Sequence, residues 1–130
     1  MALAALLAAS GCRTATVRHP KHTERIDLAA DRAAPDVEMV VVDAVEVGLP
    51  PGPDGSAGFV WEIASNNAQI LEQMGPLKAA PAAGSGAPPA TVSFFALKPG
   101  RSILRFVLVR PGEAETTPAA KCQVMVRVSD

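Results

Sequence analysis

Apolar and polar residues alternate along much of the chain from Val37 onward, and alternation with a period of two is typical of β-strands with one buried face. In the segment Ser102–Val109, Leu104, Phe106 and Leu108 fall on one face, which we assign to the core. Arg105, Val107 and Val109 fall on the opposite face of this segment. The pattern therefore predicts strands of a half-buried sheet.

Seven segments show this pattern or are rich in β-branched residues, and clusters of glycine and proline separate them. In the predicted strand Thr91–Leu97 we assign Val92, Phe94 and Ala96 to the core. Seven short strands over about 95 residues predict an all-β fold, an immunoglobulin-like antiparallel β-sandwich. The predicted strands are Val37–Val42, Ala44–Leu49, Phe59–Ile63, Ala68–Glu72, Thr91–Leu97, Ser102–Val109 and Ala119–Val128.

The last predicted strand contains one of the two cysteines of the chain, Cys122, which shares a face with Val124, Val126 and Val128. Because an unpaired cysteine is among the most buried residue types, we expect Cys122 to be a core residue and not a nucleophile. We also place Trp61, the single tryptophan, in the core.

Residues 1–11 are apolar and uncharged, and they end in Ala9-Ser-Gly before Cys12. This junction resembles the lipobox of bacterial lipoproteins. The resemblance implies a signal peptide over 1–11, cleavage before Cys12 and lipid on that cysteine. A lipid would anchor the protein to a membrane of the bacterial cell envelope, facing the periplasm or the exterior. An ordinary secretory signal or an apolar N-terminal helix of a cytosolic protein remain the alternatives.

Residues 12–36 then form a predicted tether to the sandwich domain at 37–130, because they are mixed in charge and lack apolar periodicity. A short helix over Glu24–Ala33 is one possibility within the tether. His19 and His22 lie close together, but a structural zinc site needs four ligands and no third one follows nearby. We therefore expect no metal and no other cofactor.

The composition argues against several classes of protein. The 130 residues carry 12 basic and 13 acidic side chains, a net charge of -1, so no global field attracts nucleic acid. The predicted domain contains no histidine to serve a serine or cysteine nucleophile, and carboxylates such as Asp43, Glu46 and Glu62 are scattered. These observations predict a protein that is not an enzyme.

Three segments between the strands are Asp54-Gly-Ser-Ala-Gly-Phe-Val-Trp61, Gly84-Ser-Gly-Ala87 and Arg110-Pro-Gly112. In order and spacing they resemble the three target-binding loops of the chagasin-like cysteine peptidase inhibitors. Gly58, Phe59 and Trp61 match the first motif, and Gly84 and Gly86 the second. Arg110 and Pro111 match the third, where Gly112 replaces an aromatic residue.

The resemblance implies a reversible inhibitor that plugs the active-site cleft of a papain-like cysteine peptidase with three loops. Ser56 would hydrogen-bond within its loop or to the target, and Phe59 and Trp61 would anchor the loop base. The implied protease-binding residues are Asp54, Gly55, Ser56, Ala57, Gly58, Phe59, Gly84, Ser85, Gly86, Ala87, Arg110, Pro111 and Gly112.

Each segment also has a plainer interpretation. Asp54-Gly55 is a common turn pair, 84–89 is an Ala/Pro/Gly loop, and Arg110-Pro-Gly112 is a strand end. The alternative function is that of an immunoglobulin-like envelope lipoprotein domain, which serves structural or other protein contacts without inhibiting a protease.

Overall fold

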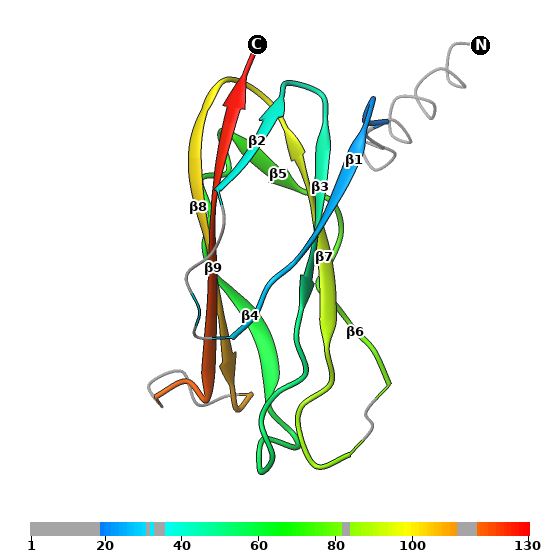
Figure 1. Ribbon diagram of the computed structural model, residues 1–130, viewed down its shortest axis with the longest axis vertical. Coiled ribbons are helices and arrows are strands. Elements are labelled where there is room, and N and C mark those ends of the chain that lie inside the picture. Colours follow the sequence, from blue (N-terminus) through cyan, green and yellow to red (C-terminus); the bar gives the residue numbers. More distant parts are fainter. Residues whose placement is uncertain (1–18, 31, 33–35, 82–83, 112–116) are drawn as a thin grey trace, which may run out of the picture.

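Two β-sheets packed face to face make up the computed structural model, which describes residues 19–30, 32, 36–81, 84–111 and 117–130 (Figure 1). One sheet has the order β1-β3-β7-β5, with β6 also paired to β7, and the other has the order β2-β9-β8-β4. We call them sheet A and sheet B. The strands are β1 (Thr23–Asp27), β2 (Asp36–Val40), β3 (Ala44–Leu49), β4 (Val60–Ser65), β5 (Leu71–Gln73), β6 (Lys78–Ala79), β7 (Ala90–Ala96), β8 (Gly100–Val109) and β9 (Ala120–Ser129).

The all-β sandwich expected from the sequence is confirmed, with three differences in detail. The described residues form nine strands where we expected seven, because β1 and β6 are additional. The pairings β1/β3 and β2/β9 are parallel, whereas all the others are antiparallel. The predicted strand Ala68–Glu72 is also displaced, since the chain turns at 68–70 and pairs only from Leu71.

The core lies between the two sheets and is built largely from aliphatic side chains. The expected core faces are confirmed: Leu104, Phe106 and Leu108 of β8 are each fully buried. Phe94 of β7 meets Phe106 of β8 across the sandwich, with ring centroids 6.5 Å apart and an interplanar angle of 60°. This tilted arrangement suits the quadrupoles of the two rings and joins the sheets at their centre.

Other core assignments are also confirmed. Val92 and Ala96 are buried beside Phe94, and Trp61 is 5% exposed. Cys122, Val124, Val126 and Val128 are all buried along one face of β9, as the period-two pattern predicts.

Strand β1 corrects the expectation that a tether or a short helix occupies this part of the chain. Five residues, Thr23–Asp27, pair in register with β3, so the first part of the expected helix, Glu24–Asp27, is a strand. Ile26 packs against the core and Leu28, just beyond the strand, is 6% exposed. The sandwich therefore recruits residues well before Val37, because this segment covers the edge of β3 and buries two aliphatic side chains.

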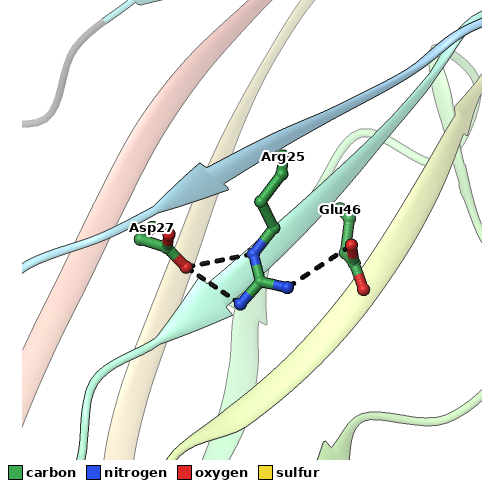
Figure 2. Close-up of polar contacts among 3 residues, drawn as sticks. All are labelled: Arg25, Asp27 and Glu46. Carbon is green, nitrogen blue, oxygen red and sulfur yellow. Dashed lines mark hydrogen bonds and ion pairs between the residues drawn. The ribbon is translucent and has the colours of Figure 1, made fainter.

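An ion-pair cluster fastens β1 to the outer face of sheet A (Figure 2). The Arg25 guanidinium lies 2.9 Å from Asp27 Oδ1 through Nη2 and 3.4 Å from Glu46 Oε1 through Nη1. The pKa of Arg25 is raised, mainly by the hydrogen bond to Asp27 and to a smaller extent by Glu46. Gly48 of β3 leaves room for this cluster, because a Cβ there would lie 2.7 Å from Arg25 Nη2.

Among the described residues, no helix is long and apolar enough to cross a membrane.

Candidate functional site

The three candidate loops lie together at one end of the sandwich. Loop one is 50–59 between β3 and β4, loop two is 80–89 between β6 and β7, and loop three is 110–119 between β8 and β9. They gather at the lower end in Figure 1, opposite the C-terminus. Loop three is described only at 110–111 and 117–119.

Strand register explains why loop one lies between the other two. In sheet A, Leu49 at the end of β3 pairs with Ala90 at the start of β7, so loop one begins where loop two ends. In sheet B, Val60 at the start of β4 pairs with Val109 at the end of β8, so loop one ends where loop three begins. Loop one therefore crosses from one sheet to the other with a neighbour on each side.

Loops one and two are joined by hydrogen bonds between main chains. The Gly52 N–H donates to the Ala87 carbonyl at 2.8 Å, and the Gly55 N–H donates to the Ser85 carbonyl at 3.2 Å. On the exposed side, the Ser85 hydroxyl donates to Asp54 Oδ1 at 2.8 Å. These bonds hold two glycine-containing loops in one arrangement, although each would be mobile by itself.

Ser56 is the buried polar centre of this junction, with 2% of its surface exposed. Its hydroxyl donates to the Pro53 carbonyl within loop one and accepts the Ala87 N–H of loop two at 2.9 Å. Of the two roles considered for Ser56, the structure therefore supports bonding inside the protein. Because its donor is already used and the side chain is buried, this hydroxyl is not placed to bond a target.

Gly86 allows the close approach of the two loops. A Cβ at this position would collide with the Gly52 carbonyl oxygen and would lie 2.9 Å from the Pro53 carbonyl oxygen. Since both atoms belong to the main chain of loop one, they cannot rotate away as a side chain would. A residue other than glycine here would push loop two off loop one.

Loops one and three meet through Phe59 and Arg110. The guanidinium carbon of Arg110 lies 5.2 Å from the centroid of the Phe59 ring, which is cation–π geometry. Phe59 is half-buried and packs against the core, so it presents a fixed surface to the arginine. The expectation that Phe59 belongs to the loop base agrees with this position.

Trp61 closes the base of loop one. Its indole Nε1–H donates to the Pro50 carbonyl at 2.9 Å. This bond joins the first residue of loop one to the strand that follows the loop. Because the indole is buried, the bond is shielded from water, and it fixes the separation of the two ends of the loop.

The exposed edge of the three loops is narrow and consists mostly of main chain. Gly55, Gly58 and Gly84 have φ values of +91°, +91° and +93°, and open space lies where a Cβ would be. Glycine is needed there for the backbone conformation and not for lack of room. Small residues along the rim leave peptide groups accessible to a partner. Of the thirteen candidate residues named from the sequence, those exposed are Asp54, Gly55, Ala57, Gly58, Gly84, Ser85, Arg110 and Pro111.

The structure thus sorts the thirteen loop residues named from the sequence. Ser56 and Ala87 are buried and support the loops from beneath, and Gly86 is partly buried at the contact between them. Gly112 lies outside the described residues, as does Cys12. In the described part of the chain, no group of three or more His, Cys, Asp or Glu side chains is placed to hold a metal ion.

Two contributors were missed at the sequence level, Gly52 and Pro53. The first donates to loop two, and the second supplies the carbonyl that Ser56 binds. The available signal was the run Pro50-Pro-Gly-Pro53, in which three prolines restrict the backbone of the first half of the loop.

Comparison with solved structures identifies proteins of the same fold, whereas sequence comparison finds no match. No family model matches the chain, and no curated protein matches it. The cysteine protease inhibitor EhICP2 from Entamoeba histolytica superposes with a TM-score of 0.62 at 15% identity, over 85% of this chain and 100% of that chain. The chain has a chagasin-like fold.

Two further solved structures share the chagasin-like fold. Amebosin superposes with a TM-score of 0.58 at 15% identity, over 85% of this chain and 100% of its own. PbICP-C, solved in complex with falcipain-2, gives a TM-score of 0.53 at 13% identity, over 88% of this chain and 95% of its own. The match extends over nearly the whole length of each of these proteins.

Proposed function

We propose that this chagasin-like domain is a reversible inhibitor of papain-like cysteine peptidases and that its three loops together occlude the active-site cleft. The observation that carries the proposal is that contacts between neighbouring loops hold the three loops together at one end of the sandwich. Hydrogen bonds join loops one and two, and the Phe59–Arg110 contact joins loops one and three. Fold similarity to a cysteine protease inhibitor and to a protein solved in complex with falcipain-2 supports the same function.

The physical basis of inhibition is steric. A cleft that binds an extended peptide also accepts a narrow rim of exposed main chain, and loop one at the centre of the rim would lie nearest the catalytic cysteine. Loops two and three would contact the two walls. Because hydrogen bonds and the Phe59–Arg110 contact already order the loops, little conformational entropy remains to be lost on binding. No chemistry by the inhibitor is required.

The deciding experiment is a titration of the full-length chain against papain and a cathepsin-L-like peptidase. We expect competitive, reversible inhibition. Gly58→Val should weaken it by at least about tenfold, because a β-branched residue at φ +91° distorts the centre of the rim. Gly75→Val is the matched control: Gly75 has a φ of +94° and open space around it, but it follows β5 on the edge of sheet A.

If wild-type protein at micromolar concentration inhibits neither enzyme, the proposal is wrong, and an envelope domain without inhibitory activity is the better description. If both glycine variants weaken inhibition equally, loss of general stability and not of the rim accounts for the effect.

We also propose that the protein is anchored to a bacterial membrane through lipid on Cys12. Sequence supports this through Ala9-Ser-Gly-Cys12. The position of β1 is compatible with it: Thr23 pairs with Ala44 at the start of β3, so the chain enters the domain at the end away from the loops. Cys12→Ser should abolish labelling by a radioactive fatty acid and release the protein from membranes; unchanged fractionation would contradict the proposal.

A further inference from the structure

The outer face of sheet B carries a stripe of positive charge that neither the fold nor the loops explain. In β8, Arg101 and Arg105 are exposed on the side opposite the buried Leu104 and Phe106. In β9, Lys121 and Arg127 are exposed on the same outer side. We call these four residues the basic stripe; they occupy the two central strands of the sheet, although the whole chain has a net charge of -1.

The arrangement within the basic stripe is unfavourable for folding. Arg101 and Arg127 are direct cross-strand partners, and like charges at directly opposed positions destabilise a sheet. Arg105 hydrogen-bonds Gln123 through Nε at 3.0 Å, which leaves its charge uncompensated. In the part of the chain that the structure describes, none of the four cations forms an ion pair with a carboxylate. Three acidic residues are exposed on the same face of the flanking strands: Asp36 and Glu38 on β2, where Glu38 is the register partner of Arg127, and Glu62 on β4.

Two surface hollows adjoin Arg105. One of about 390 Å³ is lined by Arg101, Arg105 and the amides Asn66 and Asn67, with Ile103 and Met125 in its wall. The other, of about 270 Å³, is lined by Arg32, Arg105 and Lys121. Each hollow therefore presents at least two cations, and the first adds amide groups, a combination suited to phosphate oxygens.

The spacing of the cations distinguishes a surface from a single small ligand. Arg101 and Val107, the partner of Lys121, are six residues apart on β8, so the basic stripe extends about 20 Å at the rise of a strand. One phosphate cannot reach all four side chains. Between the cations, Ile103, Val107 and Met125 are half-exposed aliphatic side chains that suit the boundary between headgroups and acyl chains.

We propose that the basic stripe is a docking surface for a membrane that carries anionic phospholipid headgroups. Charge complementarity and the even spread of cations over a sheet face favour this partner. β8 and β9 run lengthwise to the loop end, so docking through their outer face leaves the loops at the end uncovered (Figure 1). The proposal depends neither on lipid at Cys12 nor on protease inhibition.

The test is co-sedimentation of the full-length chain with vesicles of phosphatidylcholine, alone or mixed with phosphatidylglycerol. Wild-type protein should bind the mixed vesicles more tightly, and added salt should weaken that binding. Arg101→Gln/Arg127→Gln should weaken it by about 25-fold, at about fivefold for each charge removed near an anionic surface. The double variant removes both the like-charge pair and the cationic partner of Glu38, so it should remain folded, as circular dichroism would verify.

The matched control is Lys21→Gln/Lys78→Gln, which removes two charges from the other side of the molecule: Lys78 belongs to β6 and Lys21 immediately precedes β1 of sheet A. It should bind mixed vesicles within about twofold of wild type. Arg101→Lys/Arg127→Lys, which keeps both charges, should also bind.

Three results would overturn the proposal. The first is equal binding of the Gln double variant and the control. The second is equal binding of wild type to neutral and mixed vesicles, which assigns membrane affinity to another part of the chain. The third is a combination of two observations. NMR signals of the arginines show that inorganic phosphate or an acidic polypeptide saturates the basic stripe, and vesicle binding does not depend on phosphatidylglycerol.

Discussion

The hydroxyl of Ser56 in loop one accepts the main-chain N–H of Ala87 in loop two, 31 residues away, at 2.9 Å. Both residues are buried, so the bond lies beneath the exposed rim and not in it. Together with the exposed bonds between Gly55 and Ser85 and between Ser85 and Asp54, this contact couples the two loops. It therefore offers a way to alter loop geometry without touching any residue of the binding surface.

Ser56→Ala should destabilise the protein by about 1–3 kcal/mol, because it leaves the buried Ala87 N–H without its acceptor. Thermal unfolding measures the loss, and inhibition should weaken in parallel. Ser85→Ala is the control: it removes an exposed bond to Asp54 and should change stability by less than about 1 kcal/mol. Equal melting temperatures for the two variants would contradict the buried-centre role of Ser56.

Gly86→Ala should separate loops one and two, since the new methyl group meets the main chain of Gly52 and Pro53. We expect a stability loss of roughly 1–3 kcal/mol and faster hydrogen exchange at the Gly52 and Gly55 amides, which bond loop two. Gly84→Ala strains only its own backbone, so those two amides should remain protected. Unchanged protection in Gly86→Ala would show that loop two adapts without moving loop one.

Arg110→Gln should weaken inhibition about two- to fivefold, which corresponds to the 0.5–1 kcal/mol typical of an exposed cation–π contact. The expected cause is loss of the Phe59 contact that positions loop three. Arg110→Lys keeps the charge and should lose less. Arg101→Gln removes an equally exposed arginine from the outer face of sheet B and should leave the inhibition constant unchanged; a comparable effect would reveal general electrostatics instead of a loop contact.

Wild-type inhibition should be weaker than that of a chagasin-like protein with complete motifs. The chagasin-like loop motifs that this chain resembles have a proline at the position of Gly55 and a threonine at the position of Ala57. They have an aromatic residue at the position of Gly112. A lost rigid proline, hydroxyl and aromatic anchor cost about 0.4–1, about 1 and about 2 kcal/mol, together roughly two to three decades of affinity. Gly112→Trp should tighten binding, mainly by slowing dissociation, as stopped-flow kinetics would measure. No change in dissociation rate would contradict this.

A chain that begins at Asp36 should be less stable than the full-length chain, because it lacks β1 and the buried side chain of Leu28. Burial of one leucine alone is worth about 1.5–3 kcal/mol, and the edge of β3 would become unpaired. Denaturant unfolding measures the difference. Arg25→Gln, which removes only the exposed ion pairs of β1, should cost less than about 1 kcal/mol. Equal stability of the truncated and full-length chains would show that β1 is dispensable.

Much of the fold was predictable because the signals for it are local. Leu104, Phe106 and Leu108 recur at every second position, and the backbone of a strand sends alternate side chains to opposite faces, so their burial on one common face follows from this spacing. The same reasoning placed Cys122 in the core, whereas Trp61 was placed there as the single tryptophan of the chain, and both are buried. The glycines of the loops were also recognisable, and three of them adopt the positive φ values that favour glycine.

Strand β1 was not predictable in this way. Thr23–Asp27 contains one aliphatic residue, Ile26, and its polar composition suggests a tether. Its pairing with β3 is parallel and depends on an unoccupied sheet edge that exists only after β3 and β7 have paired. A local sequence pattern of five residues cannot predict pairing with such an edge.

The candidate site shows the same division. By itself, the sequence determined an all-β chain, the faces of its central strands and three glycine-containing loops in chagasin-like order, because strand alternation and turn chemistry act over a few residues. Only the tertiary structure decided that Ser56 points inward to Ala87, that Gly86 meets Gly52, and that Arg101 and Arg127 lie side by side. Each of these relationships joins residues more than twenty positions apart, and the register of the strands, not the local sequence, brings such residues together.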